Sequence, residues 1–236
     1  MPHPSGRPWI VAHRGARLVE PENTVAAFRA AAALGSDAVE LDVRRTADRT
    51  LLVVHDPVLP GWSRPIVEMT REQVRIAAPH IPDLDEALDG WSGMWVDIEI
   101  KNAPFEPDWD PDAATTRDVA GLVRELDVSD RVLITSFDPG SVSAALDEGL
   151  RAGLLVTRSA DPLESIEALP GIEMVLPNVS ALAGSRAVEV VSGAGARGIE
   201  VGVWTVNDPA EMRRLAEAGV GAIATDDPGL AAATLA

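Results

Sequence analysis

Two histidines follow short apolar runs in the first quarter of the chain. His13 comes after the run 9–12, and His55 comes after the run 51–54. A polar group at the end of a buried strand costs free energy unless it is paired, bound to a metal or used in chemistry. A buried structural histidine is the alternative for either residue alone. Together, with carboxylates between them in the sequence, the two histidines favour proton transfer in an active site.

Acidic residues at a spacing of two lie between these histidines. Glu40 and Asp42 fall on one expected strand, so their side chains project to the same face. Neighbouring carboxylates repel each other unless a cation or a proton separates them. Glu99 lies near the end of a later strand, and three oxygen ligands without cysteine suit Mg²⁺ or Ca²⁺ better than zinc. A solvent-facing edge strand is the alternative, but parallel strands have little solvent-facing surface.

A few basic and aromatic residues could complete such a site. Lys101 is the only lysine among the 20 basic residues, which indicates either a bias towards arginine or a site that needs a compact ammonium group. Arg14 precedes Gly15, whose missing side chain would let the backbone approach a ligand closely. Phe137 and Trp204 come at the ends of later strands, where an aromatic ring could line the pocket or fill the interior of the fold.

The composition argues against several classes of partner. The formal net charge of −17 disfavours nucleic acid and stable anchoring on anionic membranes. No apolar run approaches the roughly 18 residues that span a bilayer, and no secretory apolar segment precedes the first strand. Without cysteine there is no disulfide, thiolate nucleophile or zinc–sulfur site, so we expect a cytoplasmic location. The oligomeric state is not indicated, and His3 and His80 are assigned no function.

Apolar runs that alternate with alanine-rich amphipathic stretches predict the elements that position these side chains. Strands are expected at 9–13, 38–43, 51–55, 95–100, 131–135, 152–156, 173–176, 200–205 and 221–224. Helices are expected at 24–34, 112–126, 139–148, 162–168, 185–197 and 208–218. The alternation predicts a parallel sheet covered by helices. Because it runs through the whole chain, we expect a (β/α)8 TIM barrel in a single domain, 1–236, with its core at about 9–228.

Nine predicted strands exceed the eight places of such a barrel, so one of them must lie outside it or be wrong. The connection between positions 43 and 51 is too short for a crossover helix, so it either crosses in extended form or makes a local hairpin. In both cases His55 can lie close to the paired carboxylates. The segments 57–82 and 102–112 carry no predicted helix or strand, and both are expected on the loop face where barrel active sites form.

Taken in order, motifs between about residues 10 and 228 resemble those of the glycerophosphodiester phosphodiesterase family, whose fold is a PLC-like (β/α)8 barrel. The matching motifs are His13-Arg14-Gly15, Pro21-Glu22-Asn23-Thr24, Glu40-Leu41-Asp42-Val43, His55-Asp56, Ile81-Pro82-Asp83-Leu84-Asp85-Glu86-Ala87-Leu88, Glu99-Ile100-Lys101, Ser136-Phe137, Val203-Trp204-Thr205-Val206-Asn207 and Thr225-Asp226-Asp227-Pro228. One departure is the segment between His55 and Ile81, where family members carry an inserted subdomain. This segment is short and shows no clear helix pair, which bears on substrate size and not on the chemistry.

The resemblance assigns a role to each candidate residue. The ligands of one divalent cation, Mg²⁺ or Ca²⁺, are then Glu40, Asp42 and Glu99. The acid–base pair is His13 and His55. The cations near the phosphate or the metal are Arg14 and Lys101, and Trp204 is expected to contact the substrate.

These roles predict metal-dependent hydrolysis of a small-molecule glycerophosphodiester to glycerol 3-phosphate and an alcohol. Two alternatives use the same site: a lysophospholipid-directed reaction of the phospholipase D type, and a cyclising phosphodiesterase reaction. An enolase-type barrel is a further rival, against which the pairing of Glu40 with Asp42 counts. A binding protein on an inactivated barrel would be expected to have lost at least one key position, and none is lost.

Overall fold

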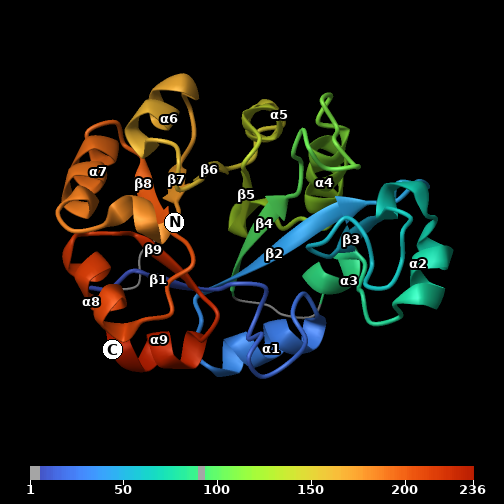
Figure 1. Cartoon of the computed structure of the whole chain (residues 1–236), viewed down its shortest axis with the longest axis horizontal. Helices are drawn as coiled ribbons and strands as arrows, with labels where there is room; N and C mark the ends of the chain where they lie inside the picture. The colour runs from blue at the N-terminus through green and yellow to red at the C-terminus, as the bar shows by residue number, and fades with distance from the viewer. Residues whose placement is uncertain (1–5, 90–93) are drawn as a thin grey trace.

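Parallel strands close into a barrel in the part of the chain that the structure describes, residues 6–89 and 94–236 (Figure 1). The computed structural model places eight of them in the order β1-β2-β4-β5-β6-β7-β8-β9, and β1 pairs with both β2 and β9, which closes the ring. Their bounds are β1 Trp9–Ala12, β2 Ala38–Arg45, β4 Trp95–Ile100, β5 Val132–Ser136, β6 Ala152–Val156, β7 Met174–Pro177, β8 Glu200–Val203 and β9 Ala222–Thr225. The predicted (β/α)8 fold is therefore confirmed. His3 lies outside the described residues.

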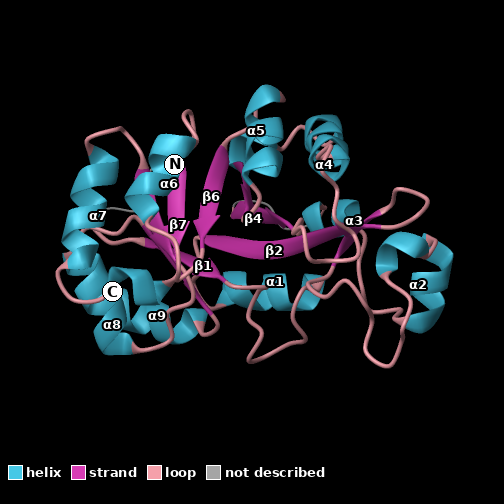
Figure 2. Ribbon diagram, turned by 45° about the horizontal axis from the view of Figure 1, so that its top comes forward, coloured by secondary structure: helices cyan, strands magenta, loops and turns pink. Residues whose placement is uncertain are grey.

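Helices surround the strands, as Figure 2 shows. Those that match predicted ranges are α1 Val25–Ala33, α4 Ala114–Glu125, α5 Pro139–Asp147, α6 Pro162–Ala168, α7 Arg186–Gly195 and α8 Pro209–Glu217. Those that the sequence patterns did not predict are α2 Arg71–Ala77, α3 Leu84–Leu88 and α9 Pro228–Leu235. No helix within the described residues is long and apolar enough to cross a membrane.

Several helices begin at an Asp-Pro pair. At the start of α5 the Asp138 side chain accepts a hydrogen bond from the backbone N–H of Ser141. Pro139 takes the first helical position, where a backbone N–H is not needed. The same pair begins α6, α8 and α9. The start signal of α9, Asp227-Pro228, was therefore present in the sequence, and the helix could have been predicted from it.

The strand β3 (Leu51–Val53) pairs antiparallel with the end of β2 and lies outside the barrel. Val43 stands opposite Val53, so the short connection between these strands makes a local hairpin and not a crossover. The backbone N–H of Val54 donates to the carbonyl of Asp42 at 2.9 Å. This bond keeps the end of β3 next to the part of β2 that carries Asp42. The hairpin thus brings His55 to the carboxyl end of the barrel.

Apolar side chains fill the barrel beneath this end. They form one buried cluster, made of Trp9, Val11, Ala38, Leu133, Leu155, Met174, Leu176 and Ala222. Because every second side chain of a strand points to the same face, His13 follows Val11 in the inward row of β1, and Glu40 follows Ala38 in that of β2. The interior therefore changes from apolar to charged along the same rows of side chains.

The segment 57–82 folds beside β3 at the edge of the molecule (Figure 1). It has a small buried cluster in common with β3, made of Leu52, Leu59, Ile66, Met69, Val74, Ala78 and Ile81. A 3-10 turn, Ile66–Glu68, precedes α2, which begins with a capping box between Thr70 and Gln73. The segment 102–112 contains neither helix nor strand, as expected.

Candidate active site

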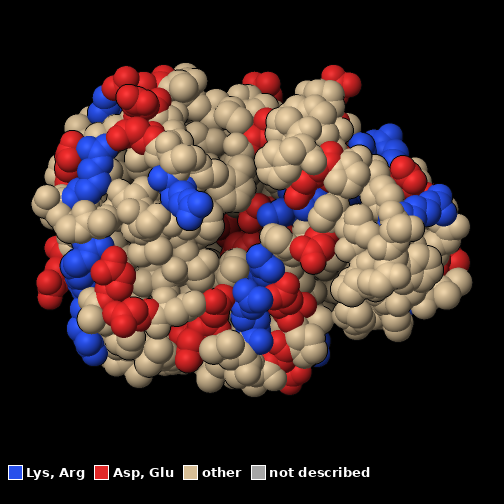
Figure 3. Space-filling view, in the orientation of Figure 1, with Lys and Arg blue, Asp and Glu red and all other residues tan. Residues whose placement is uncertain are grey.

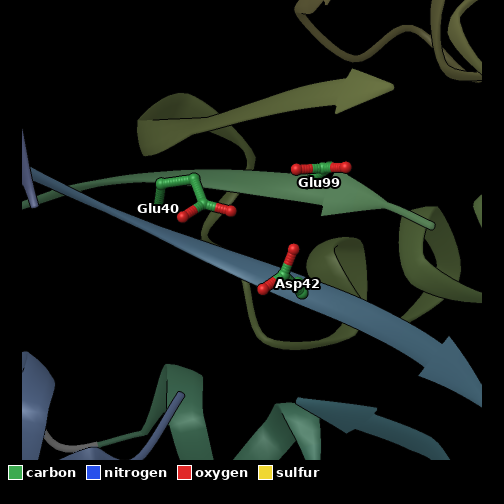
Figure 4. Close-up of side chains that lie close together, drawn as sticks. All are labelled: Glu40, Asp42 and Glu99. Atoms are coloured by element: carbon green, nitrogen blue, oxygen red, sulfur yellow. The ribbon is translucent and has the colours of Figure 1, made fainter. Parts of the chain in front are cut away.

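Three carboxylates converge inside the carboxyl end of the barrel. Glu40 and Asp42 lie on β2, Glu99 lies on the neighbouring strand β4, and Asp42 stands directly opposite Glu99 in the register (Figure 4). Each of the three offers an oxygen atom, and these atoms lie within 4.8 Å of one another. All three residues are buried. The structure therefore brings together the three residues that the sequence proposed as metal ligands.

Two oxygen atoms of this cluster are buried without a hydrogen-bond partner among the described residues. They are Oε1 of Glu40 and Oδ1 of Asp42. The other oxygen of each carboxylate is held: Glu40 Oε2 accepts from the backbone N–H of Arg14 at 2.8 Å, and Asp42 Oδ2 accepts from Asn23 Nδ2 at 2.7 Å. A carboxylate oriented through one oxygen and left open at the other is suited to bind a metal ion. An all-oxygen donor set of this kind fits Mg²⁺ or Ca²⁺.

Burial and mutual repulsion shift the protonation of these carboxyl groups. Burial raises the pKa of Glu40 well above its usual value, and the negative charges of Asp42 and Glu99 raise it further. Burial also raises the pKa of Glu99, although Lys101 opposes the shift. The pKa of Asp42 is lowered, because Lys101 and Arg14 together outweigh the effect of its burial. A bound cation would relieve the repulsion among these three groups.

The two histidines flank this cluster. Both line a cavity of about 90 Å³ together with Glu40, Glu99 and Lys101. His13 Nδ1 lies 2.7 Å from Asp226 Oδ1, and His55 Nδ1 lies 2.7 Å from Asp56 Oδ1. In each ring the carboxylate occupies Nδ1, so Nε2 is the atom left for proton transfer.

The partners of the two histidines differ in number. Asp226 also accepts from Asn207 Nδ2 at 2.7 Å and from Arg17 Nη1 at 3.3 Å. These contacts, with the hydrogen bond to His13 as the largest contribution, lower the pKa of Asp226. Burial lowers the pKa of His55, although the nearby carboxylate of Asp42 opposes the shift.

The predicted cations contact the carboxylates directly. Lys101 Nζ lies 2.7 Å from Glu99 Oε1 and 3.6 Å from Asp42 Oδ1. Arg14 Nε lies 3.3 Å from Asp42 Oδ2, and its Nη1 donates to Glu22 at 2.8 Å. Both cations are thus within reach of an anion that enters the cavity.

Gly15 serves a different purpose from the predicted one. A Cβ atom there would stand 2.8 Å from the backbone of Ala27, so the missing side chain permits close packing against α1.

Two aromatic residues also line the cavity. Phe137 and Trp204 meet edge to face with ring centroids 5.3 Å apart, and both line the cavity. Trp204 is fixed by a hydrogen bond of 2.7 Å from its indole N–H to the carbonyl of Leu176. Both roles that the sequence left open are observed, because the two rings line the cavity and also pack against the apolar cluster inside the barrel. His80, in contrast, is exposed.

Two further polar residues of the site have no role assigned from the sequence. Asn23, interpreted from the sequence as part of a helix start, is buried and orients Asp42 through its amide. Asp97, which the spacing of two places on the same face as Glu99, accepts from the Thr135 hydroxyl at 2.6 Å. Burial raises its pKa to about 7.

The surface of the molecule is hollowed at this position. Figure 3 shows acidic and basic side chains together in a depression near the middle of the face, with further charged side chains directly below it. The charged groups of the site are therefore open to solvent on this face.

Comparison with known proteins gives a consistent result. The sequence profile of the Glycerophosphoryl diester phosphodiesterase family matches residues 13–230. The chain is 29% identical over 245 residues to the glycerophosphodiester phosphodiesterase of Caldanaerobacter subterraneus subsp. tengcongensis, which covers 93% of this chain and 94% of that relative. It is 29% identical over 241 residues to the glycerophosphodiester phosphodiesterase of Bacillus altitudinis, with coverages of 93% and 94%. The crystal structure of the glycerophosphodiester phosphodiesterase of Agrobacterium tumefaciens superposes with a TM-score of 0.75 at 28% identity, over 96% of this chain and 99% of that one.

Proposed function

Because the chain belongs to the glycerophosphoryl diester phosphodiesterase family, we propose that it hydrolyses glycerophosphodiesters to glycerol 3-phosphate and an alcohol with one divalent cation, Mg²⁺ or Ca²⁺. The family makes it a phosphoric diester hydrolase that acts on a small molecule. The observation that supports the metal-dependent reaction is the pair of buried carboxylate oxygens on Glu40 and Asp42 that lack a hydrogen-bond partner among the described residues. They lie beside Glu99 and near two histidines.

In this proposal Glu40, Asp42 and Glu99 hold the cation. When bound, the cation neutralises charge on a phosphate oxygen and makes the phosphorus easier to attack. Arg14 and Lys101 stabilise the negative charge that develops on the phosphoryl oxygens. Their positive charge also offsets the repulsion that an anionic substrate meets from a protein of net charge −17.

His13 and His55 transfer the protons. One accepts a proton from the attacking water molecule, and the other donates a proton to the leaving alkoxide as its bond to phosphorus breaks. Asp226 and Asp56 fix each ring through Nδ1, so the second nitrogen of each is available in the cavity. Each transfer contributes roughly 10²–10⁴ to the rate.

The first experiment measures activity and metal binding separately. Metal-stripped protein is incubated with glycerophosphocholine, with and without Mg²⁺ or Ca²⁺, and phosphorus NMR follows the product. We expect glycerol 3-phosphate to be released only with a cation, and no cyclic phosphate. The absence of release with either ion, in protein shown to be folded, would contradict the proposed reaction.

Thermal unfolding tests the metal site without relying on activity. A cation at about 100 times its dissociation constant stabilises the folded state by about 2.7 kcal/mol. We expect this gain in wild-type protein and its loss in Asp42→Asn. Asp97→Asn is the matched control. Asp97, on β4, is a buried aspartate like Asp42, but it does not belong to the three-carboxylate cluster. Equal gains in the two variants would exclude Asp42 as a metal ligand.

A further inference from the structure

A second and larger cleft opens beside the catalytic cavity. Its volume is about 530 Å³, against about 90 Å³ for the cavity that holds the histidines. The two lie next to each other, because both are lined by Glu99, Lys101, Phe137 and Trp204. A substrate held at the carboxylates therefore lies beside the larger cleft.

The inner cavity is the smaller of the two, and charged side chains line it. This space suits a phosphate group. The larger cleft beside it is the space into which a group attached to the phosphate can extend.

The outer wall of the cleft is mainly apolar. Its apolar residues are Ile100, Ala103, Pro104, Phe105, Phe137, Pro139 and Trp204. Phe105 is 88% exposed, the highest value among the large apolar side chains of the described residues. A contiguous set of apolar side chains that lines a cleft next to an active site is typical of a surface that binds an apolar ligand.

The acidic residues of this wall already have partners. Glu106 is hydrogen-bonded to Arg44 through both carboxylate oxygens, each at 3.1 Å. Asp138 accepts from Asn102 at 3.0 Å and from the backbone N–H of Ser141 at 2.8 Å. Because these carboxylates are occupied, the wall presents mainly apolar and aromatic surface to a ligand.

Arg44 also fixes the position of this wall. Its side chain is fully buried, and besides Glu106 it contacts Asp108 at 2.5 Å and the carbonyl oxygen of His55 at 2.6 Å. The loop that carries Phe105 is therefore attached to the same side chain that holds the backbone of a catalytic candidate. The apolar wall and the catalytic cavity thus keep a defined relative position.

We propose that this cleft binds an apolar chain of the substrate, so that the enzyme prefers glycerophosphodiesters that bear an alkyl or acyl group over those with small polar groups alone. The proposal rests on the proposed function, since the chain must be attached to a diester that the site hydrolyses. The apolar group is carried either by the leaving alcohol or by the glycerol. Both present the same chemistry to the wall.

A homologous series of substrates tests the proposal. The esters of glycerol 3-phosphate with ethanol, butanol and hexanol are compared by kcat/KM below their micelle concentrations. Each CH₂ group that is fully buried is worth up to about a fourfold gain. We expect kcat/KM to rise at least twofold per added CH₂ group. A matching series with short acyl chains on the glycerol of the ethanol ester shows which side of the diester occupies the cleft.

The outcomes separate this proposal from the proposed function. Hydrolysis of all members of both series with equal kcat/KM would overturn the preference for apolar chains and leave the reaction intact. Absence of hydrolysis throughout both series, in folded and metal-loaded protein, would contradict the reaction and the preference together.

A pair of surface variants locates the effect in the cleft. Phe105→Ser is expected to lower kcat/KM for the hexyl ester by about tenfold, and for the ethyl ester by much less. Ile76→Ser is the matched control, because Ile76 is 74% exposed on α2 and does not line the cleft. An unchanged chain-length dependence in Phe105→Ser would exclude this wall as the binding site of the chain.

Discussion

His13 follows a strand of the barrel itself, whereas His55 follows the short hairpin strand outside it. Each ring has a carboxylate 2.7 Å from Nδ1. The two carboxylates differ in their surroundings: the Asp226 side chain is 22% exposed and the Asp56 side chain 66%. Asp226 is held in addition by Asn207 and Arg17. The pair of His13 with Asp226 is thus largely buried, whereas the carboxylate of the pair of His55 with Asp56 is open to solvent.

The two histidines also differ in what holds their main chain. The backbone N–H of His13 donates to the carbonyl of Thr225, the last residue of β9, at 2.9 Å. The carbonyl oxygen of His55 accepts from Nε of the buried Arg44 at 2.6 Å. A barrel strand therefore supports the main chain of His13, whereas the side chain of an arginine supports that of His55. Variants that remove each kind of support test this difference.

Removal of the rings themselves has the largest expected effect. We expect His13→Ala and His55→Ala each to lower kcat by roughly 10²–10⁴, because each removes one proton transfer. The double variant is expected to be little worse than either single one, since groups that act as a unit are not additive. The assay is glycerol 3-phosphate release with circular dichroism as the control for folding. Near-normal turnover in one variant would remove that histidine from the reaction.

Removal of Arg44, which holds the main chain of His55, has the next largest expected effect. Arg44→Met leaves Glu106 and the buried Asp108 without their cation, and removal of one partner of a buried ion pair costs about 3–5 kcal/mol of stability. We expect a loss of this size in the free energy of unfolding in urea. Arg45→Met is the matched control, since Arg45 pairs with Asp118 at 3.1 Å on a partly exposed face. We expect that variant to lose about 1 kcal/mol or less.

Activity shows whether Arg44 acts through His55. At a temperature where Arg44→Met remains folded, we expect lower kcat, and no further loss when His55→Ala is added. The same addition to Arg45→Met should cost as much as in wild-type protein. If Arg44→Met lowers stability alone and leaves kcat intact, the backbone contact to His55 is not needed for turnover.

The positions of the candidate site residues were predictable from the sequence, and the residues that support them mostly were not. His13, Glu40 and Asp42 follow from local rules, because strand ends and a spacing of two place them inside the barrel. The partner of His13 lies 213 positions later, and only closure of β1 on β9 brings it near. Glu106 lies 62 positions after Arg44, in a loop with no helix or strand. Such pairs depend on tertiary folding, which no local spacing encodes.

Asp226 and Asp56, the carboxylates hydrogen-bonded to the two histidine rings, should differ in how much kcat falls when each is replaced. Asp226→Asn is expected to lower kcat by about 10- to 100-fold, as is usual for a residue that orients a reacting group. Asp56→Asn removes an exposed pair, for which about 1 kcal/mol, or fivefold, is an upper bound. Both changes keep the shape of the side chain, so kcat and KM are compared directly. Equal losses would show that exposure does not decide how much a carboxylate contributes here.

The smallest expected effect is the pH dependence of stability on the His13 side. The hydrogen bond to His13, with that from Asn207, lowers the pKa of Asp226 in the folded protein. In the unfolded chain an aspartate titrates near about 3.9, so between these two values the unfolded state binds more protons. The contribution of Asp226 to stability is therefore fully present above about pH 5 and is lost as the pH falls through its lowered folded value.

Urea unfolding at pH 7, 4 and 3 measures this contribution as the difference between wild-type protein and Asp226→Asn. We expect the wild-type advantage to shrink as the pH falls, because the asparagine does not titrate. The same difference for Asp56→Asn should be smaller at pH 7, since that carboxylate is mostly exposed. An advantage of Asp226 that stays constant from pH 7 to 3 would mean that its hydrogen bonds favour the charged form no more than water does. In that case the two histidines would differ only in the burial of their partners and not in the strength of their pairing.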